Sequence, residues 1–520
     1  MLPCDEVLRK SLNPLVYFLN EYFEQDQASN AEEKQQRFEG RFNQLLQQTC
    51  DANLTRELKR GRPFLGALLQ LPQEEVQLRQ FDAQARYENT LDALKVLFKA
   101  ESAQQPLILH LEDAHWIDPD SRDFFRLLTR NVEDCPFLLL TACRYQDDGS
   151  LFELSLESET PVQRLTLEPL SESEAGKLIA FVTRREAAVP PATLAFIHQR
   201  SSGNPFFIEQ ITLYLIENQL LDEQNNLDER LLSGQAELEI PATINAILVA
   251  RIDRLSAELK KIVKTAAVLG QEFATIILST MLRKVNAERE DELHRYLSAG
   301  EEQTIWTAIS ELRYIFRHAL IRDAVYGMQL KKQLRALHNL AGEAIEELFQ
   351  SNLSPYYVDL AEHYEKAERP EKAIFYLTLA GQAALDSYRN QQAIGLYDRL
   401  LQYPLPAEAE LSAWENKGKA QRIAGDWQAA RQTYAQMLER AEALDLPLWQ
   451  AKAANALAYF LLVHGEIEQG TALAERAQRL AVQIGAREEQ AQALRNLGIA
   501  CNKSGAWSRA REIHTEMLAL

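Results

Sequence analysis

The sequence predicts an α/β region near the amino terminus, followed by all-α structure to the end of the chain. Two short and almost wholly apolar runs, at 107–111 and 137–142, flank a segment with helical spacing. Such a pattern is typical of buried parallel strands joined by a helix. From residue 168 onward the pattern is mostly helical, and the last third repeats with a period of 40 residues. That period indicates an array of helix pairs.

Composition limits the classes of protein that need to be considered. The chain has 520 residues, which corresponds to roughly three to four domains. A hydrophobic fraction of 46% excludes a disordered chain. The 56 basic residues against 75 acidic ones give a net charge of −19, which argues against a broad nucleic-acid-binding surface.

The cysteines and the apolar runs indicate in which cellular compartment the protein is expected. The five cysteines form no CxxC pair, and an odd total fits no closed disulfide framework, which indicates a reducing environment. No apolar run reaches the 18 residues of a membrane span. Asp5 and Glu6 stand where a secretory signal would need a basic start. We therefore expect a cytoplasmic protein without a membrane segment.

Residues 1–167 are expected to form the α/β domain. Residues 1–105 are mostly helical in pattern, and strands are expected at 107–111 and 137–142, with a further one at Val162–Leu167. Between the first two strands, Asp118 suits the N-cap of a helix and Pro119 its first turn. The almost wholly apolar strands predict a sheet buried on both faces.

Two smaller domains are expected to follow, at 168–235 and 236–330. The first is helical in pattern throughout. In the second, Pro241 is expected to start a helix and Ser256 to cap another that stops at Gly270. The charged stretch 285–303 is expected to be a surface loop or a frayed helix, and apolar periodicity resumes at Phe316–Tyr326.

The last region, 331–520, contains three segments that align without gaps. Small residues recur at positions 418, 458 and 498, and a glycine follows each of them seven positions later. The small residues allow paired helices to approach closely, and the glycine ends the first helix of each pair. Less regular units precede these, around 364–373 and 393–397. The pattern resembles tetratricopeptide (TPR) repeats, which form an α-solenoid.

The sharpest chemical signal lies in the segment 107–121, LILHLEDAHWIDPDS. An apolar strand there delivers two carboxylates, Glu112 and Asp113, to its carboxyl end, which is the edge where α/β sheets bind ligands. One carboxylate can hold Mg²⁺ while its neighbour orients an attacking water. The plainer alternative is that many strands simply turn polar where they end.

The segment LEDAHWIDPDS resembles the Walker B region of STAND proteins, the signal-transduction P-loop ATPases with numerous domains. The resemblance is to the AAA-type predicted-ATPase module of bacterial multidomain regulators, and it extends over nearly the whole chain. It implies an incomplete parallel-sheet P-loop NTPase core at 1–167, a helical lid at 168–235, a winged helix at 236–330 and a TPR array at 331–520. The motifs FLLLTACRYQ, SSGNPFFIEQI and FRHALIRDAVY follow in the family's order.

The resemblance also implies roles for individual residues. Glu112 and Asp113 would be catalytic, with Glu112 holding Mg²⁺, and Arg144 would be the sensor arginine. Gly203 and Pro205 match the lid motif that faces adenine, and His318 matches a histidine that senses bound ADP. Turn chemistry alone also explains Gly203-Asn204-Pro205, and a histidine such as His318 is more often a satisfied, partly buried side chain.

One part of the family pattern is missing from the printed sequence. A P-loop ATPase needs GxxxxGK[ST], whose backbone N–H groups cradle phosphates, and these 520 residues contain no such motif. Residues 1–4 resemble the end of the second strand of the family, so we expect the loop to lie upstream. The expectation is a fragment truncated at its amino terminus, which would be inactive alone.

Two hypotheses about function follow. The first is a regulatory ATPase switch that uses ATP, ADP and Mg²⁺ and binds a protein, a peptide or a small effector on its TPR array. Activation would allow oligomerisation. The alternative is a non-catalytic TPR scaffold on a degenerate NTPase platform. DNA binding by the winged helix is disfavoured because the basic residues of 241–330 are matched by many acids.

Overall fold

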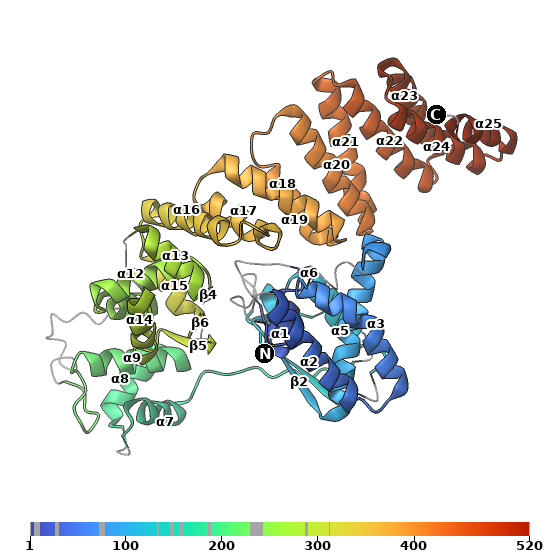
Figure 1. Cartoon of the computed structure of the whole chain (residues 1–520). Helices are drawn as coiled ribbons and strands as arrows, with labels where there is room; N and C mark the ends of the chain where they lie inside the picture. Colours follow the sequence, from blue (N-terminus) through green and yellow to red (C-terminus); the bar gives the residue numbers. More distant parts are fainter. Residues whose placement is uncertain are drawn as a thin grey trace. The chain divides into compact units, whose positions relative to one another are not determined.

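The computed structural model describes residues 2–4, 11–25, 31–71, 78–132, 135–145, 150–154, 156, 160–185, 189–228, 243–285, 290–310, 312–518 and 520. It divides into two compact units. Unit 1 contains 1–158, 351–365 and 369–520, and unit 2 contains 159–350 with 366–368. The predicted fold class, α/β followed by all-α, is confirmed (Figure 1).

The amino-terminal part of unit 1 is built on a parallel sheet. Its three strands lie in the order β1-β2-β3, with Leu2 opposite Leu111 and Leu109 opposite Leu139. The elements here are β1 (Leu2–Pro3), α1 (Asn13–Tyr22), α2 (Ala31–Gln48), α3 (Ala52–Leu68), η1 (Leu78–Gln80), α5 (Ala83–Gln104), β2 (Leu107–Glu112), η2 (Ala114–Trp116), α6 (Pro119–Leu128) and β3 (Phe137–Thr141). The two strands expected at 107–111 and 137–142 are therefore present.

Only one face of this sheet is covered by the described helices. Leu109 and Leu111 point into a core shared with α1, α5 and α6. On the other face, Ile108, Leu138 and Leu140 are 66%, 57% and 47% exposed. The expectation of a sheet buried on both faces is wrong in this structure, because every helix that contacts the sheet in the described ranges packs on the same side.

The strand expected at Val162–Leu167 is also not observed. No ladder partner is described for residues 161–171, which form neither helix nor strand, and Val162, Leu165 and Leu167 are exposed. Apolar alternation makes a segment suitable for a sheet, but a strand forms only where a neighbouring strand offers free backbone groups.

Unit 2 begins with three helices and continues with helices around a small antiparallel sheet. The sheet has the order β4-β6-β5. The elements are α7 (Glu172–Thr183), α8 (Pro191–Ser201), α9 (Pro205–Glu217), α11 (Ile244–Asp253), α12 (Ala257–Ala266), β4 (Glu272–Ala274), α13 (Thr275–Val285), α14 (Glu290–Glu302), β5 (Trp306–Ser310), β6 (Arg313–Phe316), α15 (Ala319–Gly327) and α16 (Lys331–Leu348).

The helix caps and boundaries described in unit 2 follow the predictions from the sequence with one difference. Ser256 caps α12 as expected, since its hydroxyl accepts a hydrogen bond from the amide of Leu259. The stretch 285–303 contains a regular helix, α14, because Leu293 and Leu297 lie one turn apart and are buried in the core of unit 2. The first helix of this region begins at Ile244 and is capped by Thr243. Pro241, expected to start it, lies outside the described residues.

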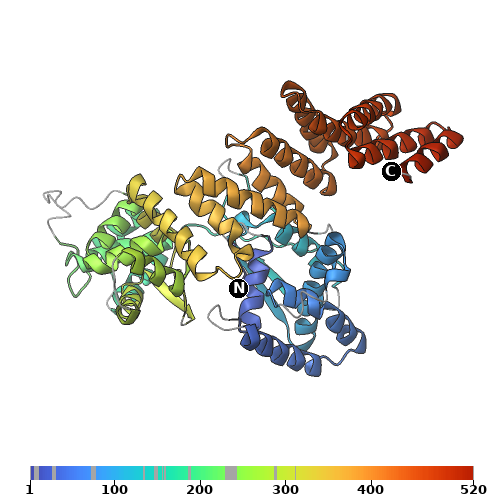
Figure 2. The same ribbon diagram turned by 45° about the horizontal axis from the view of Figure 1, so that its top comes forward.

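Helix pairs complete unit 1, and Figures 1 and 2 show α20–α25 following one another along the array. The elements are η3 (Ser354–Tyr356), α17 (Tyr357–Lys366), α18 (Pro370–Asp386), α19 (Asn390–Leu400), α20 (Ala407–Ile423), α21 (Trp427–Ala443), α22 (Pro447–Val463), α23 (Ile467–Ile484), α24 (Arg487–Lys503) and α25 (Trp507–Leu518).

The 40-residue pattern has the structural cause that the sequence predicts. A Cβ on Gly418 would lie 2.5 Å from Cε1 of Tyr434, and one on Gly498 would lie 2.5 Å from Cε1 of His514. Only a glycine lets these rings pack so closely across the helix pair. Gly425, Gly465 and Gly505, which follow the first helices, all have positive φ angles of 78–90°. Each of them takes the left-handed turn that ends a helix.

Candidate functional site

The carboxyl end of β2 presents two acidic side chains. Glu112 is the last strand residue, on the same face as the exposed Ile108. Asp113 leaves the strand in the left-handed region, with φ 51° and ψ 44°, and the chain turns there into η2. The Ala114 amide donates to the Ala142 carbonyl at 2.8 Å, which ties this turn to the end of β3. Both carboxylates therefore emerge at the edge where the parallel strands end.

Arg144 joins these acids from the segment after β3. Its Nε lies 3.8 Å from Oδ1 of Asp113, and its guanidinium carbon lies 5.8 Å from the centre of the Trp116 ring. The Arg144 side chain is 52% exposed, so this ion pair contributes little to stability. We call Glu112, Asp113, Trp116 and Arg144 the strand-end cluster. Three of the predicted site residues, Glu112, Asp113 and Arg144, meet in it.

The donor set of the strand-end cluster suits one kind of metal better than others. Within the described ranges, no group of three or more His, Cys, Asp or Glu side chains is placed to enclose a metal ion. Mg²⁺ is usually held by one or two carboxylates together with phosphate oxygens and water. Asp113 faces Arg144, whereas the exposed Glu112 has no side-chain partner among the described residues. Glu112 is therefore the carboxylate available to a cation, and the residues fit Mg²⁺ held with a phosphate.

The acids that follow have a structural task. Asp118 is buried and accepts hydrogen bonds from the amides of Leu12 and Ser121, both at 2.9 Å, and from the Ser121 hydroxyl. Burial raises the pKa of Asp118, although these hydrogen bonds act in the opposite direction. Asp120, also buried, accepts from the Tyr87 hydroxyl at 2.8 Å. Asp118 thus caps α6 as predicted, and it also fastens the chain before α1 to the segment behind the strand-end cluster.

The predicted residues Gly203 and Pro205 lie in a tight connection between α8 and α9. Gly203 has φ 71°, and its carbonyl accepts from the Leu170 amide at 2.8 Å. A Cβ at this position would lie 2.7 Å from the Leu170 carbonyl oxygen, so only glycine fits. Asn204 caps α9 and Pro205 occupies its first turn. Turn chemistry is thus sufficient to explain all three residues.

His318, at the N-terminus of α15, contacts the start of α9, directly after the connection between α8 and α9. Its ring stacks on Phe206, with centres 3.9 Å apart and planes inclined by 17°. Its Nδ1 accepts from the Leu320 amide at 3.2 Å, which caps α15, so the neutral ring carries its proton on Nε2. Beside it, Arg317 pairs with Glu209 of α9 at 3.5 Å. The structure therefore brings His318 within one residue of Pro205.

The predicted site residues thus form two groups. Glu112, Asp113 and Arg144 belong to unit 1, and Gly203, Pro205 and His318 belong to unit 2. The sequence did not reveal Phe206 as the partner of His318. Phe206 and Phe207, which directly follow Asn204-Pro205, were the one sequence feature that could have suggested it. The neighbouring residues, however, do not predict a contact with a residue more than 100 positions away.

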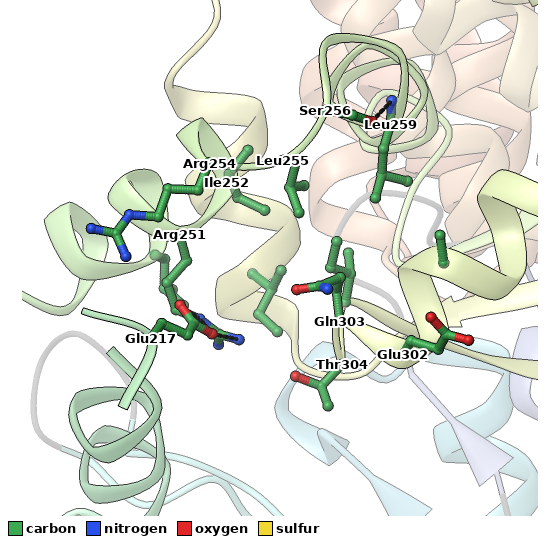
Figure 3. Close-up of a pocket in the computed structure, with 14 residues that line it drawn as sticks. Glu217, Arg251, Ile252, Arg254, Leu255, Ser256, Leu259, Glu302, Gln303 and Thr304 are labelled. Carbon is green, nitrogen blue, oxygen red and sulfur yellow. Dashed lines mark hydrogen bonds and ion pairs between the residues drawn. The ribbon is translucent and has the colours of Figure 1, made fainter. Parts of the chain in front are cut away.

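Unit 2 also contains a cavity of about 430 Å³ that the sequence did not predict (Figure 3). Its lining residues come from α9, α11, α12, α14 and α15 and from the connecting segments 254–256 and 303–305. Arg251 and Glu217 point toward one another there, with Nη2 and Oε1 2.9 Å apart, and Arg254 points away from them (Figure 3). The Arg251–Glu217 pair is neutral as a whole, and the remaining wall combines aliphatic side chains with polar ones, among them Arg254, Glu302 and Gln303.

Comparison with known proteins supports the assignment of the amino-terminal part. Residues 4–140 match the sequence model of the AAA ATPase domain. This match covers β2, the strand-end acids Glu112 and Asp113, and β3 up to its penultimate residue. The predicted resemblance to an AAA-type ATPase module is confirmed over this part of the chain.

Two curated relatives are much longer than this chain. An uncharacterized protein of Rhizobium meliloti is 28% identical over 304 residues, which are 58% of this chain and 28% of the relative. The peroxide stress-activated histidine kinase mak3 of Schizosaccharomyces pombe is 20% identical over 336 residues, which are 61% of this chain and 14% of the kinase. The chain therefore spans less than a third of either relative.

Solved structures give more distant matches. A STAND protein with a tetratricopeptide repeat sensor from Pyrococcus horikoshii is 12% identical, with a TM-score of 0.32, over 83% of this chain and 70% of that one. TPR-like repeats of a putative kinesin light chain from Podospora anserina are 17% identical, with a TM-score of 0.28, over 37% of this chain and 96% of that one.

Proposed function

We propose that this chain is part of a STAND-type regulatory ATPase, a switch between ATP-bound and ADP-bound states with a TPR sensor. The observation that carries this proposal is the pair of strand-end acids, Glu112 and Asp113, within the AAA ATPase match. Glu112 and Asp113 stand at the carboxyl edge of a parallel sheet, where α/β folds bind ligands. The proposed domains are an NTPase core at 1–167, a lid at 168–235, a winged helix at 236–330 and the array at 331–520.

Three residues of the strand-end cluster have a proposed task. Glu112, exposed and unpartnered among the described side chains, would hold Mg²⁺, which neutralises phosphate charge when it is bound with ATP. Asp113 would orient a water molecule by accepting a hydrogen bond from it. Arg144, held near Asp113 by its 3.8 Å contact, would respond to the phosphate charge.

In unit 2, Gly203 and Pro205 would face adenine and His318 would sense ADP. The stacking of His318 on Phe206 supports a shared role, because any movement of α9 against α15 must break it. With Nδ1 engaged by the Leu320 amide, a neutral His318 ring can donate a hydrogen bond only through Nε2.

The array is proposed to bind a protein, a peptide or a small effector and so to bias the switch. An effector changes such an equilibrium only if it binds the two states with different affinity. We propose oligomerisation as the activated response and the cytoplasm as the location. None of the helices described is both long enough and apolar enough to cross a bilayer.

Nucleotide titration tests the proposal. Because the 520 residues contain no GxxxxGK[ST], calorimetry on this chain should show no saturable binding of ATP, with or without Mg²⁺. In the complete gene product, Glu112→Gln should abolish hydrolysis. Glu57→Gln, which removes an exposed carboxylate from α3, is the matched control and should leave turnover unchanged.

Two results would count against these assignments. Micromolar ATP binding with hydrolysis by residues 1–520 would show that the chain holds a phosphate site of another kind. Unchanged turnover after Glu112→Gln would remove Glu112 from the catalytic machinery.

The lack of a phosphate-binding motif in the printed sequence also favours a second candidate, a non-catalytic TPR scaffold on a degenerate NTPase platform. This candidate predicts partner binding that no nucleotide alters. The discriminating observation is the reading frame that encodes this chain. A GxxxxGK[ST] motif after an apolar strand upstream of Met1 supports the switch, and its absence supports the scaffold.

A further inference from the structure

The cavity of unit 2 lies where two hydrophobic cores of that unit meet. One core contains residues of α7, α8 and α9, and the other contains residues of α12–α16 and of the small antiparallel sheet. Helix α11 contributes to both, since Ile247 is buried in the first core and Leu248 and Ile252 are buried in the second. Because α9, α11, α12, α14 and α15 all line the cavity, a molecule inside it would contact elements of both cores (Figure 3).

Aliphatic side chains give the cavity an apolar wall. Its volume of about 430 Å³ falls within the range of roughly 300–1,000 Å³ that is usual for small-molecule sites. The buried aliphatic residues of its lining, which we call the aliphatic wall, are Leu248, Ile252, Leu259, Ile305 and Ile321. A wall of this kind favours a ligand with an apolar body, because the apolar groups that it receives leave water.

The charged side chains of the lining have no net charge, since they are two arginines and two glutamates. Nε of Arg251 lies 3.0 Å from Oε1 and 3.2 Å from Oε2 of Glu217. Nη1 of Arg251 also donates a hydrogen bond to Oε1 of Gln210, and the Arg251 side chain is only 12% exposed. The protein itself therefore satisfies this pair of charges.

The other two charged side chains are directed elsewhere. Arg254 donates a hydrogen bond to Oδ1 of Asn218, and its guanidinium carbon lies 5.8 Å from the centre of the Tyr214 ring. The exposed Glu302 points away from the Arg251–Glu217 pair (Figure 3). A charged ligand would therefore lose hydration on entering the cavity without gaining an unpaired opposite charge from the described lining.

Gln303 is the lining side chain that offers hydrogen bonds to an uncharged ligand. It lies in the turn that follows α14, where its backbone amide donates to the Ala299 carbonyl at 3.0 Å and that of Thr304 donates to the Glu301 carbonyl at 2.9 Å. The Gln303 side-chain amide has no partner among the described residues, and it points toward the side of the cavity formed by Arg251 (Figure 3). An amide both donates and accepts hydrogen bonds, so it suits a hydroxyl, carbonyl or amide group.

We propose that this cavity binds a small uncharged molecule with an aliphatic body and one polar end group, such as a medium-chain alcohol or amide. The aliphatic wall receives the body, and Gln303 receives the polar end. Because the ligand contacts elements of both cores, its binding stabilises the observed packing of α9 and α11 against α12, α14 and α15. The site is separate from the strand-end cluster and from the repeat array, and the proposal does not depend on nucleotide binding.

Displacement of the uncharged dye N-phenyl-1-naphthylamine tests the chemistry of the ligand. The emission of this dye rises when it leaves water, and we expect saturable enhancement with the whole chain. 1-Octanol should displace the dye, and 1-hexanol should do so roughly tenfold less well, because it buries two fewer methylene groups. Octanoate and octylammonium carry opposite charges on the same chain at pH 7.5, and each should be about tenfold weaker than 1-octanol or worse.

Two variants test where the dye and the alcohol bind. Ala299→Leu adds three carbon atoms to the lining from α14 and should weaken dye binding by about tenfold or more. Gln303→Ala removes the polar partner and should weaken octanol binding by roughly three- to tenfold. Gln333→Ala is the matched control, because this exposed residue of α16 does not line the cavity, and it should change either affinity by less than about twofold.

Stability provides a second readout. 1-Octanol at ten times its dissociation constant should raise the midpoint of the affected unfolding transition by about 3–6 °C. Circular dichroism verifies the fold of Ala299→Leu, and Gln303→Ala, which changes an exposed side chain, tests the site even if that fold is lost.

Several outcomes would overturn the proposal. These are no saturable dye binding, displacement by octanoate or octylammonium as good as by 1-octanol, and equal octanol affinity of Gln303→Ala and Gln333→Ala. Unchanged dye binding by folded Ala299→Leu would also overturn it, because the dye would then lie on other apolar side chains, such as the exposed Ile108 and Leu138. No nucleotide is present in these assays, so their failure is distinct from a failure of the proposed ATPase switch.

Discussion

Replacing Gly203 by alanine tests the geometry that joins α8 to α9. The residue has φ 71°, and a left-handed conformation costs about 1–2 kcal/mol for a residue with a Cβ. The new Cβ would also lie 2.7 Å from the Leu170 oxygen and 2.9 Å from Cβ of Pro169, closer than such atoms approach. The backbone must then move apart, which weakens the 2.8 Å bond from the Leu170 amide to Gly203 by about 1 kcal/mol.

Together these effects predict a loss of about 2–4 kcal/mol for Gly203→Ala. In a unit of this size the loss lowers the unfolding midpoint by roughly 5–15 °C. Differential calorimetry of the whole chain measures the midpoint of the affected transition, and hydrogen exchange measures protection of the Leu170 amide. We expect both to fall.

Gly176→Ala is the matched control within the same unit. A Cβ there would approach Leu194 no closer than 3.8 Å, and the residue lies inside α7. Alanine should therefore stabilise that helix by about 0.5–1 kcal/mol. If Gly203→Ala left the midpoint and the Leu170 protection unchanged, the close approach described for this connection would be incorrect.

Three further substitutions test packing, charge and stacking. Gly418→Ala should destabilise the array by about 1–3 kcal/mol, because its Cβ would overlap the Tyr434 ring. Gly395→Ala is the control: its Cβ would meet nothing within 4 Å, so this variant should be as stable as the original chain or more stable. Urea unfolding of both variants measures the difference. Burial raises the pKa of the Glu489 carboxyl in the folded array, so the folded state binds the carboxyl proton more tightly than the unfolded chain does. As the pH rises through this raised pKa, the buried carboxyl ionises and the free energy of unfolding falls. Glu489→Gln should therefore raise the urea midpoint at pH 7.5 but not at pH 3.5, and an equal gain at both pH values would contradict this. Phe206→Ala removes the ring stacked on His318 and should cost about 1–2 kcal/mol, with faster amide exchange in α15 that Phe207→Ala does not reproduce.

Features encoded by neighbouring residues were predictable from the sequence. Asp118 and Ser256 cap the helices for which they were expected, because a cap depends on a side chain and the next three amides. The glycines at 425, 465 and 505 likewise end helices at a fixed distance from the small residues at 418, 458 and 498. In each case the physical cause lies within one helical turn or one helix pair.

Features that depend on distant partners were not predictable. Val162–Leu167 has the alternation of a strand, but no strand lies beside it in the described structure. The bare face that exposes Ile108 and Leu138 follows from which side of the sheet the helices occupy, and a run of apolar residues carries no information about that side.

The candidate site likewise contains residues that local sequence predicts and contacts that depend on distant parts of the chain. Glu112 and Asp113 were found from the strand that precedes them, and Arg144 from its place after the next strand. The stacking of Phe206 on His318 joins residues that are 112 positions apart, and the pairing of Arg251 with Glu217 joins residues that are 34 positions apart. Only the folded chain brings such residues together.

The gap-free 40-residue register of the array has a consequence for how its gene can change. In the pairs that contain Gly418 and Gly498, a glycine of the first helix lies under a ring that stands sixteen positions later in the second helix. Each of these contacts is made inside one pair, so deleting or duplicating a different unit would leave it intact. Unequal recombination can therefore lengthen or shorten the reach of this protein in whole steps without disturbing the packing inside these pairs.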